Sequence, residues 1–348
     1  MMYANILSAF FIGVLTAFFT IISIIILFFR KERTRFQRVL GYIMAVWAVW
    51  SFKDIIIILP NMYDEQVLRW ILLVDGWSAL TFTVFIFEAT LPGWTTLRRL
   101  TLLSLPFLGF TVWYAVQPQP LVIISYIAFL WCYAWLIVTI GYFKFRRYIR
   151  HIRSNYSNLE GINLSWLKPV FFFAIFSQLA WLFTSLYATV FTDVVYYLIT
   201  LLMWLVVLHY SWHYKPITIP DDDTQESSPI TTKKVAFNMP REVFIAKLME
   251  HELYLDKDLT LTALADALQT NRTYLSQYLS GVCHQTFYDC INELRIQKKS
   301  IPLMHEHPEY TLDYIAAESG FCSISTFRRA FHKFTGTTPS QFILQQQP

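Results

Sequence analysis

Long runs of apolar residues alternate with short polar segments over the first 212 residues of the chain. A helix that crosses a lipid bilayer needs about 20 consecutive apolar residues. The run from 100 to 143 is long enough for two such helices, and we divide it at "QPQP" because two prolines interrupt a helix. The pattern therefore predicts seven membrane-spanning helices, at residues 6–29, 39–59, 67–90, 100–116, 121–143, 169–192 and 194–212.

Lysine and arginine are distributed unevenly between the segments that join these helices. The segments 30–38, 91–99 and 144–168 contain 13 of them, whereas "PNMYDEQ", "QPQP", "FTD" and the first five residues contain none. Because positively charged segments stay in the cytoplasm, we predict that the N-terminus lies outside and that the chain after residue 212 is cytoplasmic. The basic segment "KFRRYIRHIRSNYS" is either a plain positive anchor, which we favour, or an amphipathic helix on the membrane surface.

Composition supports the division into a membrane part and a polar part. Only 15% of the residues are charged, against about 25% in soluble domains. The first 212 residues contain 15 basic and 8 acidic residues, and the residues from 241 onward contain 10 and 12. Three of the four cysteines lie in the polar part and none in a segment predicted to be outside, which argues against disulfides and fits a reducing compartment.

Four ionisable residues interrupt the predicted helices 39–59 and 67–90 at similar depth: Lys53, Asp54, Arg69 and Asp75. Charges inside a membrane are costly, so each is a candidate functional residue. Two interpretations stay open. Either a Lys53–Asp75 ion pair locks the two helices together while Arg69 extends to the surface, or the four residues line an outward-facing pocket that binds a polar small molecule. Glu88, near the other end of helix 67–90, is expected to reach water.

Residues 213–240 are polar and rich in Pro, Asp, Ser and Thr, which predicts a flexible linker. A helical pattern begins at 241, and one motif occurs twice in it, at about 260–280 and 311–335. Each copy has a helix-capping residue, an apolar stripe, a short turn, a second cap and two apolar residues four positions apart. The residues are Thr260, Leu261, Leu264, Ala265, Asn271, Leu275 and Leu279 in the first copy and Thr311, Leu312, Ile315, Ala316, Ser323, Phe327 and Phe331 in the second.

The second copy contains "IAAESGFCSISTFRRAFHKFTGTTPSQF", which resembles the C-terminal signature of the AraC/XylS family of bacterial transcription regulators. The matching residues are Ile315, Ala316, Gly320, Phe321, Ser325, Phe327, Arg329, Phe331, Gly336 and Pro339. "LRI" at 294–296 is similar to the connecting helix of that family. The resemblance implies an all-α domain at 241–346 with two tandem helix-turn-helix units. It also implies double-stranded promoter DNA and RNA polymerase as partners of an activator, and it fits a homodimer.

The sequence departs from the family pattern at a few positions. Lys299 replaces a small residue, Gln269 replaces a turn glycine, and "SQFIL" follows the last proline where the family often has Tyr-Arg. Pro302 falls within a connecting helix that four apolar residues between Phe287 and Ile296 predict. We expect this proline to kink or shorten the helix, because proline lacks an N–H group.

The second helix of each unit is expected to expose a face that reads DNA. The candidate contact residues are Asn271, Arg272, Thr273, Ser276 and Gln277 in the first unit and Ser323, Ser325, Thr326, Arg328, Arg329 and Lys333 in the second. The resemblance places residues 273, 276 and 277 opposite the bases. Arg329 is our candidate for two hydrogen bonds to one guanine, Arg328 and Lys333 are candidates for phosphate contacts, and Asn271 and Ser323 cap their helices as well.

The sequence shows no convincing catalytic, nucleotide-binding or metal-binding motif, and we expect neither an enzyme nor a cofactor or metal. We predict a one-component transcription regulator of the bacterial inner membrane. Its fold class is all-α: a seven-helix transmembrane bundle (1–212) that senses a signal, a flexible linker (213–240) and the DNA-binding domain. Helix 194–212 leads into the linker, and because a flexible linker transmits bending poorly, we expect the signal to act on the oligomeric state or on docking of the domain. The rivals are a transporter or membrane enzyme with an attached DNA-binding module, and a bundle that is merely a tether.

Overall fold

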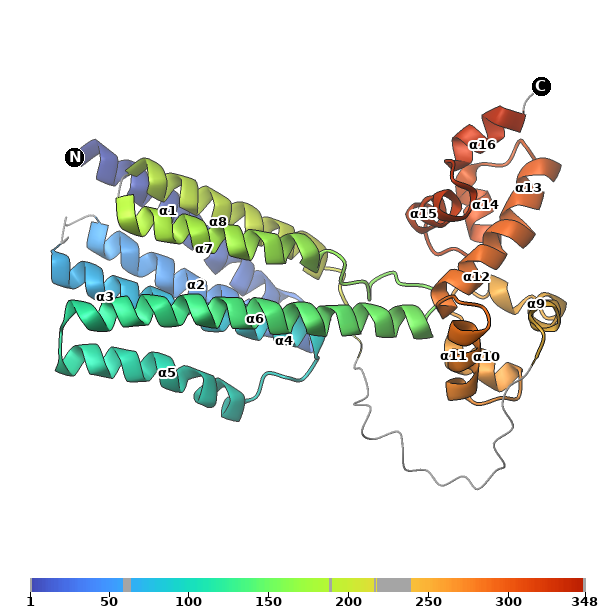
Figure 1. Ribbon diagram of the computed structural model, residues 1–348. Helices are drawn as coiled ribbons and strands as arrows, with labels where there is room; N and C mark the ends of the chain where they lie inside the picture. The colour runs from blue at the N-terminus through green and yellow to red at the C-terminus, as the bar shows by residue number, and fades with distance from the viewer. Residues whose placement is uncertain (1, 59–63, 188–189, 216, 218–238, 347–348) are drawn as a thin grey trace, which may run out of the picture. The chain divides into compact units, whose positions relative to one another are not determined.

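The structure is a computed structural model that describes residues 2–58, 64–187, 190–215, 217 and 239–346. Regular secondary structure in these ranges is entirely helical, with one isolated β-bridge between Tyr156 and Thr260. The chain divides into two compact units (Figure 1). The first consists of Met1–Tyr148 and Leu164–Ile219, and the second consists of Ile149–Asn163 and Pro220–Pro348. Most of the predicted linker 213–240 lies outside the described residues.

The first unit is a bundle of long apolar helices (Figure 1). Its elements are α1 (Met2–Ile24), the π-helical turn η1 (Ile25–Phe29), α2 (Arg35–Ile58), α3 (Glu65–Gly76), α4 (Ser78–Thr90), α5 (Leu97–Val116), α6 (Pro120–Asn155), α7 (Leu167–Tyr187) and α8 (Val190–Ser211). Helix α1 packs against α2 and α8, and α7 packs against α8. The end of α6, from Ile149 onward, belongs to the second unit.

Six helical stretches in the described part of the chain are long and apolar enough to cross a membrane. They are Ile6–Phe29, Arg35–Ile57, Glu65–Thr90, Leu97–Val116, Pro120–Asn155 and Val194–Ser211. The remaining predicted span, 169–192, corresponds to α7, in which Leu167–Ser177 is a shorter apolar helix. Residues 188–189 of that span lie outside the described ranges. The count of seven membrane-spanning helices therefore stays a prediction.

Aromatic side chains fill the interior of the first unit. The ring of Trp204 in α8 is fully buried. It lies within 6.2 Å, centroid to centroid, of Phe19 in α1, Trp47 in α2, and Phe82 and Phe85 in α4. Aromatic pairs at such distances add to the stabilisation from burial. This cluster therefore joins α8 to three helices that are distant from it in the sequence.

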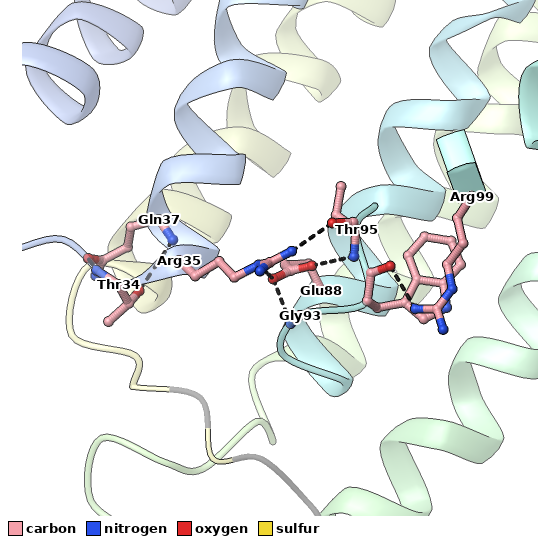
Figure 2. A network of polar contacts seen from close by, with 8 residues as sticks. Thr34, Arg35, Gln37, Glu88, Gly93, Thr95 and Arg99 are labelled. Atoms are coloured by element: carbon pink, nitrogen blue, oxygen red, sulfur yellow. Dashed lines mark hydrogen bonds and ion pairs between the residues drawn. The ribbon is translucent and has the colours of Figure 1, made fainter. Parts of the chain in front are cut away.

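Glu88 is completely buried near the end of α4, so the expectation that it reaches water was wrong. Its carboxylate accepts hydrogen bonds from the backbone N–H groups of Gly93 and Thr95, at 2.9 and 2.8 Å, and pairs with Arg35 at 3.1 Å (Figure 2). Arg35 also donates to the carbonyl oxygen of Thr95 at 2.7 Å. The carboxylate thus fastens the α4–α5 loop to the start of α2. Hydropathy alone does not show that this loop folds back over the carboxylate.

The C-terminal end of α8 is fixed within the first unit. Arg30 and Gln37 both donate hydrogen bonds to the carbonyl oxygen of Trp212, at 2.8 and 3.0 Å. The hydroxyl of Tyr214 donates to the carbonyl oxygen of Ala89 at 2.8 Å. Carbonyl groups at the end of a helix lack partners within the helix, so these donors hold the end of α8 against the rest of the bundle.

The second unit consists of short helices around two apolar cores. The first core is formed by α9 (Arg241–Glu250), the 3₁₀ turn η3 (Leu253–Leu255), α10 (Leu261–Ala267), α11 (Arg272–Gly281) and α12 (Phe287–Arg295). The second is formed by the π-helical turn η4 (Ile296–Ser300), α13 (Ile301–Glu306), α14 (Leu312–Glu318), α15 (Ile324–Thr335) and α16 (Pro339–Gln346). The segment α12–η4–α13 connects the two cores.

Pro302 stands in the first turn of α13, directly after the π-helical turn η4. The N–H of Ile301 bonds to the carbonyl oxygen of Ile296, five residues back. A π turn inserts one extra residue into a helix. The disturbance expected from the proline therefore takes the form of a wider turn, and the hydroxyl of Ser300 closes it with a 3.0 Å hydrogen bond to the Arg295 carbonyl oxygen.

Candidate nucleic-acid interface

Two helix pairs, α10 with α11 and α14 with α15, begin in the same way. Thr260 and Thr311 precede α10 and α14, and each side chain accepts a hydrogen bond from the N–H three residues on, at 3.2 and 3.3 Å. Asn271 and Ser323 precede α11 and α15 and accept from N–H groups two and three residues on, at 2.7 and 3.4 Å. These bonds satisfy backbone donors at each helix start, so capping defines where all four helices begin.

The turns inside the two pairs have the same backbone geometry. Gln269 and Gly320 occupy equivalent positions and adopt left-handed conformations, with φ of 53° and 80°. In each turn the N–H of the next residue bonds to a carbonyl oxygen five residues back, at 2.9 and 3.0 Å. The second turn has one more residue, Cys322, before its cap. Gln269 therefore takes the conformation for which the family pattern has glycine.

The candidate residues of α11 lie mostly on one exposed face. Asn271, Thr273 and Gln277 are exposed and Ser276 is half-buried. On the opposite face, residues 275 and 279 are buried in the first core, as the apolar pattern predicts. The side chains left facing outward are short and neutral, and they are suited to hydrogen bonding with base edges or phosphates.

Helix α15 carries the positively charged part of the candidate interface. Ser325, Arg328, Arg329 and Lys333 are exposed. The guanidinium of Arg329 folds back along its own helix, where its Nε donates to the carbonyl oxygen of Ser325 at 3.2 Å. Lys333 forms an ion pair with Asp289 of α12, with 2.6 Å between Nζ and Oδ1. Of the two candidates for phosphate contacts, Arg328 is therefore better placed than Lys333, which is already paired.

Thr326 differs from the expectation of an outward-facing contact residue. Its side chain is buried, with 8% of its surface exposed. The Thr326 hydroxyl accepts a hydrogen bond from the Ser323 hydroxyl at 3.1 Å. The Thr326 N–H donates to the Ser323 hydroxyl at 3.4 Å. Its position is explained by this cap, which turns the Thr326 side chain toward the helix start and away from the exposed face.

Arg272, the first residue of α11, is half-buried and contacts Asn155 at the end of α6. Its Nε and Nη2 both donate to the Asn155 Oδ1, at 2.9 and 2.7 Å. Hydrogen bonds from a charged donor are among the stronger ones in proteins. This contact could not be predicted from the sequence, because the two residues lie 117 positions apart and Asn155 belongs to no motif.

Arg295 is the buried centre of the second unit, with 1% of its surface exposed. It donates hydrogen bonds to the backbone oxygens of Tyr254 and Asp256, at 2.7 and 2.6 Å, and to the Asn292 side chain at 3.2 Å. Its guanidinium lies 5.6 Å from the ring centre of Phe321 in the second core. Burial lowers the pKa of Arg295 to about 10. This residue, the middle of "LRI", thus joins both cores.

In the first unit, the structure brings Lys53 and Asp75 together. The Lys53 Nζ lies 2.8 Å from the Asp75 Oδ1 and also pairs with the neighbouring Asp54. Arg69 is not part of this group, because it pairs with Glu65 one turn away, at 2.7 Å. Lys53 and Asp75 side chains keep 23% and 31% of their surface exposed, so the cluster combines an ion pair with partial access from outside the bundle.

Among the described residues, no group of three or more His, Cys, Asp or Glu side chains is placed to hold a metal ion. Cys283 and Cys290 are buried free thiols. Burial raises the pKa of Cys290 to about 12, so it is a protonated thiol at neutral pH and a poor ligand and nucleophile.

Comparison with known proteins identifies the part of the chain that contains both helix pairs. Residues 264–345 match the family described as "Helix-turn-helix domain". This part of the chain is similar to helix-turn-helix domains. The match confirms the helix-turn-helix part of the expected resemblance and does not extend to the first unit.

Two of the similar curated proteins are uncharacterized HTH-type transcriptional regulators of Staphylococcus aureus, from strains COL and MSSA476. Each is 30% identical to the chain over 91 residues. The similar region covers 26% of this chain and 12% of each relative. The likeness is therefore confined to a small part of both proteins. No solved structure matches the chain.

Proposed function

We propose that the protein is a membrane-bound transcription regulator that binds promoter DNA through α11 and α15. The observation that carries this proposal is the pair of equivalent helix pairs, each with a capped second helix whose outer face is polar. In helix-turn-helix proteins this second helix enters the major groove. The match of residues 264–345 to a helix-turn-helix domain and the likeness to transcriptional regulators support the same function.

The two helix pairs are tandem helix-turn-helix units with different roles in recognition. Residues 273, 276 and 277 of α11 offer hydroxyl and amide groups to base edges. In α15, Arg329 is placed to form two hydrogen bonds with a guanine once its guanidinium leaves the Ser325 carbonyl oxygen, and Arg328 contacts a phosphate. Since the residues from 241 onward contain 10 basic and 12 acidic side chains, we expect modest affinity for nonspecific DNA.

The first unit anchors the regulator in the inner membrane and senses a signal. Six long apolar helical stretches support a membrane location, and α7 completes a bundle of seven spans with the N-terminus outside. The ion-pair cluster of Lys53, Asp54 and Asp75 is the proposed sensing site, since such charges are costly in a membrane. RNA polymerase and a second copy of the chain are the further partners that this function implies.

Selection from a pool of random-sequence DNA duplexes tests the function directly. The full chain, held in neutral lipid nanodiscs, is expected to enrich a sequence with two half-sites, one for each unit. Arg329→Ala should relax the preference at one guanine, at a cost of about 1–3 kcal/mol for that base. Arg328→Ala, its neighbour on the same helix, should weaken binding to all sequences about equally. Absence of any enriched sequence with the wild-type protein would contradict the proposal.

A further inference from the structure

The segment Ile149–Asn163 belongs to the second unit, although α7, α8 and the linker separate it in the sequence from the rest of that unit. Tyr156 forms the β-bridge with Thr260, the residue that caps α10. The backbone N–H of Ser157 donates to the carbonyl oxygen of Leu259 at 3.1 Å. The backbone of the segment is therefore paired with the backbone that leads into the first helix pair.

Side chains of the segment complete the polar centre of the second unit. Ser157 is 1% exposed, and its hydroxyl and carbonyl oxygens accept hydrogen bonds from Arg295 and Asn292, both at 3.3 Å. Arg295 and Asn292 are themselves buried. A buried donor that loses its acceptor is costly, so the segment is a built-in part of this unit. Asn158 extends the contact to Cys322 in the second helix pair, with 2.8 Å between Nδ2 and Sγ.

We propose that residues 149–163 are an internal ligand of the second unit that competes with DNA for the N-terminal end of α11. This inference rests on the proposed function. The N-terminal residues of a recognition helix are the ones that meet base edges, and Arg272 is the first residue of α11. The two donors of Arg272 that bind Asn155 are the donors that a DNA phosphate requires.

The contact also reaches the region beside α15. The guanidinium of Arg153 lies 5.9 Å from the ring centre of Tyr288. Burial raises the pKa of Tyr288, and the nearby charges of Arg329 and Arg153 oppose that rise. The charges of Arg153 and Arg329 thus act on the same phenol. The docked segment therefore lies next to candidate residues of both reading helices, and DNA approaching them meets the end of α6.

This arrangement gives the membrane helices a route to the DNA-binding helices that differs from the predicted one. Helix α6 is continuous from Pro120 to Asn155, and its residues up to Tyr148 belong to the first unit. The end of α8 is instead tied down by Arg30 and Gln37. A signal that displaces the end of α6 withdraws Asn155 from Arg272 and frees α11 for DNA.

A reversible disulfide between the segment and the second helix pair tests the competition. The variant Asn158→Cys places a thiol next to the native Cys322, and diamide oxidises the pair in the full chain in phosphatidylcholine nanodiscs. The probe is a fluorescent random-sequence duplex followed by anisotropy. The oxidised protein is expected to bind it at least about tenfold more weakly than the reduced protein, and dithiothreitol should restore binding. Asn158→Cys combined with Cys322→Ser is the control, and oxidation should leave its affinity unchanged.

A second variant weakens docking without a cross-link. Asn155→Ala removes the acceptor of two hydrogen bonds, so the duplex should bind about 3- to 10-fold more tightly. Ser154→Ala, the adjacent position of α6, should leave the affinity as it is. Failure of the disulfide to form, or equal DNA affinity of the oxidised and reduced forms, overturns the proposal. If the wild-type and reduced proteins bind no duplex at all, the proposed DNA-binding function itself fails.

Discussion

Gly320 packs directly against the backbone of Leu255, so closely that a Cβ atom on Gly320 would lie 2.4 Å from the Leu255 carbonyl oxygen. Gly320 also has a left-handed conformation, with φ of 80°. A left-handed residue with a Cβ costs about 1–2 kcal/mol, and overpacking costs about 1–3 kcal/mol more. We therefore expect Gly320→Ala to destabilise the second unit by about 2–5 kcal/mol, measured by thermal unfolding of the full chain in nanodiscs.

Two other positions provide controls for this prediction. A Cβ on Gly281, the last residue of α11, meets no atom within 4 Å, so Gly281→Ala should change stability by less than about 0.5 kcal/mol. Gln269 is the left-handed equivalent of Gly320 in the first pair, and Gln269→Gly should be neutral or stabilising by up to about 1 kcal/mol. A Gly320→Ala protein as stable as Gly281→Ala would contradict the close packing described here.

Glu88 should be essential for the stability of the first unit although it lies outside the proposed sensing site. Its buried carboxylate serves two backbone N–H groups and Arg35. Glu88→Leu leaves these donors without an acceptor, and we expect a loss of about 1–3 kcal/mol, as for hydrogen-bond donors that lose their acceptor. Arg35→Ala should lower the stability less, because the Glu88 carboxylate still accepts hydrogen bonds from the two backbone N–H groups. Thermal unfolding in detergent measures both, and equal losses would show that the ion pair alone matters.

Substitutions in the cluster of Lys53, Asp54 and Asp75 distinguish two roles: an ion pair that only holds the helices together, and a site that senses a signal. Lys53→Leu alone leaves the carboxylates of Asp54 and Asp75 without their shared cation, with an expected loss of about 3 kcal/mol. The triple variant Lys53→Leu, Asp54→Asn and Asp75→Leu removes all three charges and should unfold close to the wild-type temperature. If the cluster senses a signal, the triple variant should be stable but should no longer change reporter transcription in response to the signal.

The opposite result separates the alternatives. A triple variant that is stable and still fully responsive would make the cluster a structural lock. Arg69→Ala supplies a matched control for charge removal at similar depth, because Arg69 pairs with Glu65 outside the cluster. It should leave both the unfolding temperature and the response close to those of the wild type, because an exposed ion pair contributes little to stability.

Local chemistry explains which parts of the second unit could be predicted from the sequence. Thr260 and Thr311 determine helix starts through bonds to residues only three positions on, so their pattern is visible in a short window. The left-handed turn was visible at Gly320 because glycine favours that conformation. At Gln269 the same conformation could not be predicted, because residues other than glycine rarely adopt a positive φ.

Long-range polar contacts explain what the sequence could not show. Asn155 and Ser157 look like ordinary loop residues, yet their partners Arg272 and Arg295 are more than a hundred positions away. Glu88 is a similar case, since its environment depends on how the next loop folds. Apolar periodicity specifies which helix faces are buried. It gives no information on which polar side chain completes the hydrogen bonds of another element.

Labelling of the cysteines tests both the membrane topology and the burial of thiols in the second unit. Cys322 is exposed in the second unit, whereas Cys283 and Cys290 are buried. A membrane-impermeant maleimide at pH 7.5 should therefore label Cys322 in inside-out membrane vesicles and leave it unlabelled in intact cells, if this unit is cytoplasmic. Cys132 lies in the proposed membrane region of α6, where such a reagent does not reach. Cys322→Ser should abolish the labelling, and labelling of Cys322 in intact cells would place the second unit outside.

Cys290 should stay unlabelled until the unit unfolds, because its thiol is buried and its pKa is raised to about 12. The folded state therefore holds the thiol proton more tightly than the unfolded chain, in which the pKa is about 8.5. The resulting stabilisation is fully present below pH 8.5 and is lost progressively as the pH rises toward 12. Labelling of Cys290 followed against pH should show a rising rate over that window, ahead of global unfolding of the first unit. A rate that is already high at pH 7.5 would show that Cys290 is accessible in the folded protein.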